Sequence, residues 1–163
     1  MNEELDETPA SQRLADLGLT LPPVTTPLAA YTPAIATSGQ VWTSGQLPMV
    51  EGRLPVSGKV GAEVSLDQAV ELARICALHA RAAAASVAGG VDGIRRILKV
   101  VVYVASAPDF TQQPQVANGA SELLGAVFGP LGVHVRSAVG VAVLPLNAPV
   151  ELEMVVEASA ASF

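Results

Sequence analysis

The segment from His134 to Glu157 constrains the fold more than any other part of the chain, because its residues alternate in polarity as they do in β-strands. A short connection with proline and asparagine divides it into two predicted strands, His134–Pro145 and Val150–Glu157. Side chains of a strand point alternately to its two faces, so each predicted strand has one face for the core. In the first strand we expect the core face to hold Ser137, Val139, Val141 and Val143. The other face carries Arg136 with small residues, and the second strand adds glutamates, which together predict the floor of an anion-binding site.

Composition indicates one domain that is unusually rich in apolar residues. The chain has 163 residues, of which 15% are charged and 50% are apolar, against about 25% charged in typical soluble domains. The longest apolar runs, such as Val100–Ala105, are much shorter than the roughly 20 residues of a membrane span. Met1–Glu7 is acidic and polar, unlike a secretory leader. We therefore expect a soluble, cytoplasmic protein with no membrane partner, whose extra apolar surface is covered in an oligomer.

Charge and cysteine content disfavour several classes of function. The net charge is −6 and only nine residues are Lys or Arg, so a nucleic-acid partner is not expected. Cys76 is the single cysteine, which excludes an internal disulfide and a zinc site built of several cysteines. It falls in an apolar helical stretch, where a small buried residue is the favoured interpretation. His79 and His134 are far apart in sequence, and no metal site is expected.

Two long helices are predicted from their end signals. Ser65 and Gln68 form a capping box, so a helix is expected to begin there and to run to about Ala88, before Gly89 and Gly90. A second helix is expected over about 113–128, ending at a Gly-Pro pair. A short helix over about 9–17 and a proline-rich surface segment over 21–27 precede them.

The remaining elements complete an α+β pattern. A hairpin is expected from Tyr31–Thr37 and Gln40–Ser44, and a β-branched strand over Ile97–Ala105. The predicted order is β-β-α-β-α-β-β. Two helices cannot cover both faces of a sheet that carries arginine and glutamate on one side, so both are expected on one face. A neighbouring subunit would then cover the other face, and sites would lie at subunit junctions.

Three groups of residues between Tyr31 and Glu157 carry a family resemblance. They are Thr43–Pro48; Lys99–Tyr103 with Asp109, Phe110 and Asn118; and Arg136–Val139 with Leu144, Pro145 and Val150–Glu153. With them the chain resembles the RidA/YjgF family of reactive-intermediate deaminases, also labelled the endoribonuclease L-PSP family. The resemblance implies a chorismate-mutase-like fold, with a mixed sheet, two long helices on one face, and a trimer whose sheets face inward. It divides the chain into an N-terminal extension (1–30), a RidA-like domain (31–158) and a tail (159–163).

The same resemblance implies a ligand site between two subunits. Arg136 would grip the substrate carboxylate, since a planar guanidinium makes two parallel charge-assisted bonds to such a group. Glu151 would position or activate water. Further substrate-binding positions are Tyr31, Ser44, Gly45, Asn118, His134 and Ala138. Ser44 belongs to the turn before Gly45, and no neighbouring histidine suggests that it is a nucleophile. The implied reaction is hydrolysis of an enamine or imine, such as 2-aminoacrylate, to a 2-oxo acid and ammonia without a cofactor.

Departures from the family pattern leave alternatives open. Ala138 stands where the family usually has cysteine, and His134-Val135 stands where Pro-Ala is usual. A small-carboxylate binding or sensing trimer is therefore the second hypothesis, and an endoribonuclease, disfavoured by the acidic charge, is the third. Arg136 could instead form an interfacial salt bridge with Glu151 or Glu153 of the same or a neighbouring chain. Glu153 or His134 could handle protons in place of Glu151, whereas His79 is expected to be structural.

Overall fold

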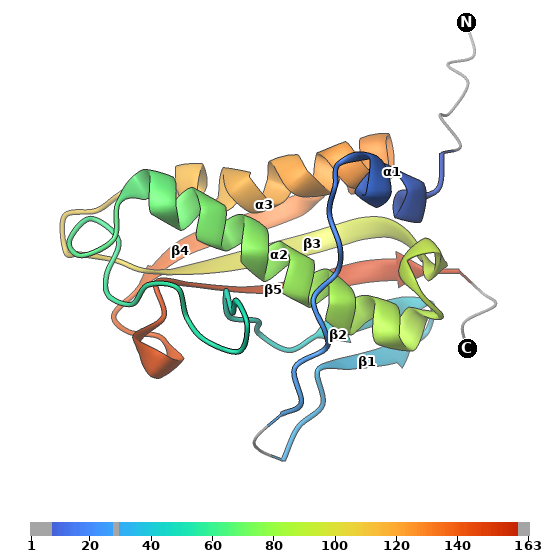
Figure 1. Ribbon diagram of the computed structural model, residues 1–163, viewed down its shortest axis with the longest axis horizontal. Helices are drawn as coiled ribbons and strands as arrows, with labels where there is room; N and C mark the ends of the chain where they lie inside the picture. Colours follow the sequence, from blue (N-terminus) through green and yellow to red (C-terminus); the bar gives the residue numbers. More distant parts are fainter. Residues whose placement is uncertain (1–7, 28–29, 160–163) are drawn as a thin grey trace, which may run out of the picture.

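A mixed five-stranded sheet carries two long helices on one of its faces in the computed structural model, which describes residues 8–27 and 30–159 (Figure 1). The strands are β1 (Ala34–Thr37), β2 (Gln40–Thr43), β3 (Ile94–Ala105), β4 (Val135–Val141) and β5 (Val150–Ala158). Their order across the sheet is β1-β2-β5-β3-β4, with β3 and β4 parallel and the other pairs antiparallel. The α+β class, the chain order of the elements and the one-sided helix layer are thus confirmed.

The helices begin and end at the predicted signals. They are α1 (Ala10–Asp16), α2 (Leu66–Ala88) and α3 (Gln113–Phe128), with short 3-10 turns at Val91–Gly93, Gly129–Gly132 and Pro145–Asn147. The Ser65 side chain accepts from the Gln68 backbone N–H, and the Gln68 side chain returns the bond, so the capping box is complete. Gly89 ends α2 with a φ of 79°, in the left-handed region that glycine adopts without strain. No helix in the described part is long and apolar enough to cross a membrane.

The helix layer packs closely because its contact residues are small. A Cβ atom at Gly119 of α3 would overlap the backbone carbonyl of Val70 on α2, so only glycine permits this approach. Alanines line the buried side of α2 (Ala69, Ala73, Ala77, Ala80 and Ala84). Beneath the helices, alternate residues of β3 and β5 form the core: Val100, Val102, Val104, Val150, Leu152, Met154 and Val156. The segment after α1 passes in front of α2 in Figure 1, and Leu19 and Leu21 pack against this core.

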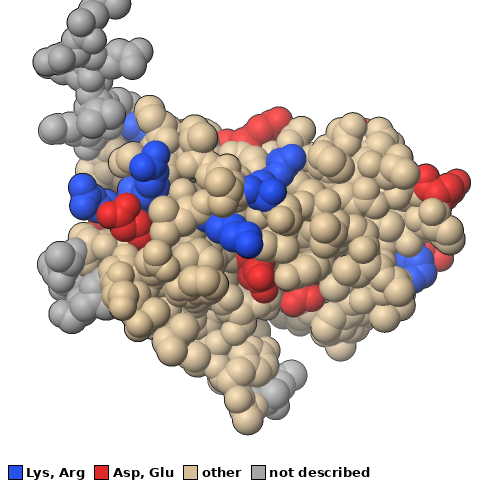
Figure 2. All heavy atoms as spheres, turned by 180° about the vertical axis from the view of Figure 1, so that it is seen from behind, with Lys and Arg blue, Asp and Glu red and all other residues tan. Residues whose placement is uncertain are grey.

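The opposite face of the sheet is not covered by any helix in the described ranges. One row of residues crosses all five strands on this face: Ile35, Trp42, Val155, Lys99 and Val135. Ile35, Trp42 and Val135 are exposed large hydrophobic residues. Figure 2 shows this side of the molecule as mostly uncharged, with a few basic and acidic side chains interspersed. We refer to it below as the open face.

One prediction about the terminal strands is wrong. Arg136 pairs with buried Val100 and lies on the helix side of the sheet, whereas Glu151 pairs with Tyr103 and lies on the open face. β3 also separates the two strands. Alternation shows which residues of a strand share a face but not which face is turned to the core. Because β4 is an edge strand beside α3, small residues such as Ala138 pack inward, and the predicted core residues Ser137 and Val139 are exposed.

Candidate functional site

Arg136 lies on edge strand β4 and is held by three neutral acceptors of α3. Its Nη1 donates to Asn118 Oδ1 at 2.9 Å and to Ser121 Oγ at 3.1 Å, and its Nη2 donates to the Pro114 carbonyl at 3.3 Å. Among the described residues no carboxylate pairs with Arg136, so the predicted alternative of an internal salt bridge to a glutamate is not found there. The guanidinium is therefore fixed in orientation while its charge is left without an acidic partner.

His134 extends this network through Ser121. The His134 Nδ1 lies 2.6 Å from the Gly132 carbonyl and its Nε2 lies 2.9 Å from Ser121 Oγ. A carbonyl only accepts, so Nδ1 donates to Gly132, and in this tautomer Nε2 is the acceptor for the Ser121 hydroxyl. Ser121 can then donate to His134 and accept from Arg136 at once. The result is a continuous chain of hydrogen bonds that fixes the arginine, beside a pocket of about 290 Å³ lined by these three side chains.

Glu151 lies on the open face, against Gly45. A Cβ atom at position 45 would overlap the Glu151 carboxylate, so the absence of a side chain makes room for it. Gln46 exchanges two backbone hydrogen bonds with Leu152, at 2.8 and 3.0 Å, which ties this loop to β5. Burial raises the pKa of Glu151, and the neighbouring Glu153 raises it further. Such a carboxylate is a stronger base than an exposed one.

Tyr103 stands beside these two glutamates. Burial raises the pKa of its hydroxyl, and so do the charge of Glu153 and a hydrogen bond to it. The neutral Tyr103 hydroxyl donates to Glu153, whereas Glu151 is the glutamate that lies against Gly45. The open face thus holds a small acidic cluster on β3 and β5.

The remaining predicted residues fall around these two groups. Tyr31 is 58% exposed and lines a pocket of about 310 Å³ together with Gly45. Ser44 is structural in its contacts, since its Oγ donates to the Thr32 carbonyl at 2.6 Å and its backbone N–H to Pro33. Ala138 is half-buried against the core, next to Arg136 in the strand.

Within one chain the predicted site residues therefore form two separate groups. The arginine group contains Arg136, Asn118, His134 and Ser121, on the helix side of β4. The glutamate group contains Glu151, which lies beyond β3 on the open face, Gly45 against its carboxylate, and Tyr31, which lines a pocket with Gly45. The sheet itself therefore separates Arg136 from Glu151 of the same chain.

Sequence reasoning missed Ser121 and Tyr103. Ser121 follows Asn118 by three residues, which places both on one face of a helix, and this spacing could have indicated it. Tyr103 alternates with buried Val102 and Val104 and so faces the same side as Glu151.

Two residues set aside as structural are structural in the fold. Cys76 is fully buried, and burial raises the pKa of its thiol well above the usual value. His79 is buried and its Nε2 lies 2.8 Å from the Met49 carbonyl. No cluster of three or more potential metal ligands occurs within residues 8–27 and 30–159.

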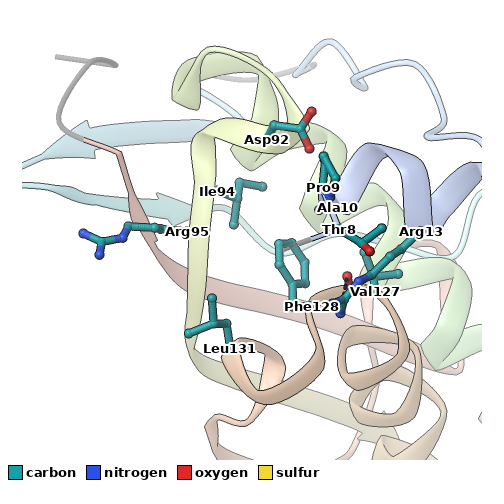
Figure 3. Close-up of a pocket in the computed structure, with 10 residues that line it drawn as sticks. All are labelled: Thr8, Pro9, Ala10, Arg13, Asp92, Ile94, Arg95, Val127, Phe128 and Leu131. Atoms are coloured by element: carbon teal, nitrogen blue, oxygen red, sulfur yellow. Dashed lines mark hydrogen bonds between the residues drawn. The ribbon is translucent and has the colours of Figure 1, made fainter. Parts of the chain in front are cut away.

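A further pocket of about 290 Å³ lies between α1 and the end of α3, but it gathers no reactive groups (Figure 3). Asp92 already accepts from the Ser11 backbone N–H at 2.9 Å and from its hydroxyl at 2.6 Å. Arg13 lies beside the Val127 carbonyl, and Arg95 extends away from the other labelled side chains. We therefore place the candidate site at the arginine and glutamate groups.

Comparison with known proteins agrees with the α+β fold described above. Residues 11–157 match the family model described as "YjgF/chorismate mutase-like, putative endoribonuclease". The chain belongs to this family. The match begins within α1 and ends within β5.

Two relatives are similar over nearly the whole chain. Protein TCP17 of Trypanosoma cruzi is 39% identical over 145 residues, which span 88% of this chain and 91% of that protein. The crystal structure of protein Atu1372 from Agrobacterium tumefaciens, described as of unknown function, is 41% identical with a TM-score of 0.84 and covers 92% of each chain. TdcF of E. coli, solved with bound serine, shares the fold at 23% identity with a TM-score of 0.60, covering 85% of this chain and 94% of its own.

Proposed function

We propose that this protein is an imine deaminase that hydrolyses a small 2-imino acid to a 2-oxo acid and ammonia at sites shared between copies of the chain. The observation that carries the proposal is Arg136, a half-buried cation oriented by three neutral acceptors and lacking a carboxylate partner among the described residues. Its Nε–H and one Nη2–H donate to no residue within 8–27 and 30–159, and these two donors form the side of a guanidinium that binds a carboxylate in parallel. A 2-imino acid supplies that carboxylate.

A site shared between chains follows from the separation of the two groups. Arg136 sits on the free edge of the sheet, where Val133, Val135, Val139 and Val143 are exposed. Exposed apolar side chains in this number favour a covered edge and a neighbouring subunit. We propose a homotrimer in which the arginine group of one chain meets the glutamate group of its neighbour. This arrangement matches the intersubunit site that the family resemblance implies.

The chemistry needs one anchor and one base. Arg136 binds the carboxylate and so orients the C=N carbon beside it toward the neighbouring chain. Glu151 accepts a proton from water as the water oxygen bonds to that carbon, and it passes this proton to the imine nitrogen, which gives a carbinolamine. Glu151 then carries the hydroxyl proton to the amino group, so the C–N bond breaks, ammonia leaves and the carbonyl forms. The raised pKa of Glu151 suits a group that both accepts and donates protons.

Mixed assemblies test the function and the shared site together. Arg136→Ala and Glu151→Gln chains are each expected to lose imine hydrolysis, measured as 2-oxo acid released when an amino-acid oxidase generates the imine. When the two variants are co-expressed in equal amounts, a site takes Arg136 from one chain and Glu151 from another. The chance that both are intact is one half times one half, so about a quarter of wild-type activity should return. Size-exclusion chromatography of each variant provides the control, because loss of assembly would mean that the substituted residue is structural.

An inactive mixture would contradict the shared site, and an inactive wild-type protein would contradict the deaminase. In the second case the protein would belong with non-catalytic carboxylate binders, and ligand-induced thermal stabilisation would be the next measurement. The endoribonuclease function in the family's description is not favoured by a net charge of −6 or by the sparse, mixed charges of Figure 2. RNA cleavage that disappears with Arg136→Ala would reverse that judgement.

A further inference from the structure

The pocket of about 310 Å³ beside Gly45 has walls without charge. They come from four segments: residues 25–27, the stretch from Tyr31 to Pro33 that leads into β1, the loop 45–49 after β2, and the turn 145–146 before β5. None of the described residues that line it is Asp, Glu, Lys, Arg or His. Leu47, Met49 and Leu146 give it an apolar character that is typical of a small-molecule site rather than of a polar surface hollow.

The pocket and the Glu151 carboxylate both lie against Gly45. Gly45 forms part of its wall and also carries the Glu151 carboxylate against its Cα. The paired backbone bonds between Gln46 and Leu152 hold this wall on β5, and His79 holds the Met49 carbonyl from α2. A molecule whose reacting carbon lies at Glu151 therefore has this pocket available for another part of its structure.

Leu146 is a second, independent indication of a ligand. Its φ is 59°, in the left-handed region that is unfavourable for a branched side chain, and Asn147 follows with a φ of 58°. Hydrogen bonds from Asn147 to Leu144 at 3.0 Å and from Gly58 to Asn147 at 2.9 Å maintain this turn. The Leu146 side chain is nevertheless 70% exposed, so burial in the core does not explain the strain. Strained backbone that displays an apolar side chain at a pocket points to a binding role.

We propose that this pocket is the side-chain subsite of the candidate site and selects 2-imino acids with bulky apolar side chains, such as those derived from leucine, methionine or phenylalanine. The inference rests on the proposed imine hydrolysis. Apolar walls favour each added methylene group and offer no charged partner to a small polar side chain. Tyr31 and the segment 25–27 form the outer wall, so this part of the chain contributes to specificity.

The test compares kcat/KM for imines generated from leucine and phenylalanine with kcat/KM for those generated from alanine. The wild-type ratio of bulky to small substrate is expected to be about tenfold or more. Leu146→Asn keeps a residue that tolerates the left-handed backbone but removes the apolar side chain, and Thr26→Trp fills the pocket from an exposed position. Each should lower the ratio by about fivefold or more. Leu17→Ala, an exposed leucine on no described pocket, is the matched control and should leave the ratio unchanged.

Failure of this inference can be distinguished from failure of the proposed function. Turnover with a ratio near one, or a ratio that neither variant moves, would overturn the subsite while the deaminase stands. No turnover of any imine would overturn the deaminase, and calorimetric binding of 4-methyl-2-oxopentanoate against pyruvate then decides the subsite alone. Tighter binding of the larger acid that is lost in Leu146→Asn supports the subsite, and equal binding overturns it.

Discussion

Arg81 tests whether a buried positive charge on α2 stabilises or destabilises the fold. Its side chain is fully buried in α2, and none of its three guanidinium nitrogens has a hydrogen-bond partner in the described structure. The guanidinium lies over the ring of Phe128, whose centroid is 5.0 Å from the guanidinium carbon. Replacing it by methionine, Arg81→Met, removes the charge but keeps an unbranched side chain with high helix propensity.

The size of the effect follows from the pKa. Burial lowers the pKa of Arg81 from its usual value to about 10, although the charge of Asp92 acts in the opposite direction. A change of this size corresponds to about 3 kcal/mol for carrying the charge in the folded state. The interaction with the Phe128 ring returns about 1–2 kcal/mol. Arg81→Met should therefore stabilise the fold by about 1–2 kcal/mol, or roughly 5 °C in Tm for a chain of this length.

The pH dependence has a definite sign. Because the folded pKa lies below the unfolded one, the cost of the charge is present in full below about pH 10. It disappears as the pH rises above about 10 toward the higher pKa of the unfolded chain, because in this range the folded protein loses the proton first. The stability advantage of Arg81→Met over the wild type should thus be constant at neutral pH and shrink above pH 10.

Thermal and denaturant unfolding at one fixed chain concentration provide the measurement, since assembly also affects Tm. Arg74→Met is the matched control, a partly exposed arginine two turns earlier on α2, and should change stability by less than about 0.5 kcal/mol. If Arg81→Met were less stable than the wild type at neutral pH, the charge would be a net stabiliser and the reasoning would be refuted.

Three further predictions concern the site. Gly45→Ala introduces a methyl group that displaces the flexible Glu151 carboxylate, so kcat/KM should fall about 100-fold with little change in Tm, and retained activity would contradict the placement of the base. Glu153→Gln removes a charge that raises the pKa of Glu151, so the acid limb of the kcat/KM profile should move to lower pH, and an unmoved limb would mean that another group titrates. Ser121→Ala breaks the bond to Arg136 and should raise KM about tenfold, whereas Ser121→Thr, which keeps a hydroxyl, should restore it.

Local signals in the sequence predicted the helices well and the strand arrangement less well. The bounds of α2 follow from Ser65, Gln68 and Gly89, because capping and termination depend on residues a few positions apart. The position of β3 between β4 and β5 depends on pairings across long stretches of chain, which alternation along one strand does not contain. The orientation of Arg136 was misjudged for the same reason.

For the candidate site, too, the sequence indicated the residues but not their arrangement in space. The sequence indicated Arg136, Asn118, His134, Gly45 and Glu151 as residues of interest, and the structure brings the first three together and the last two together. It did not indicate that the two groups lie on opposite faces. The apolar pocket also escaped prediction, because its walls come from four separate segments without a shared pattern.

The contact between Gly119 and the Val70 carbonyl has a consequence for how relatives of this protein can diverge. A larger residue at position 119 would separate α2 from α3 and displace Asn118, which precedes it on α3, and Ser121, which follows it. The side chains between α2 and α3 therefore cannot be replaced by larger ones without moving the helices apart. The segments 25–27 and 145–146 carry no such constraint, since both lie outside the core. Changes of substrate range should accumulate in these two segments during evolution, while the interior of the helix pair stays small and uniform.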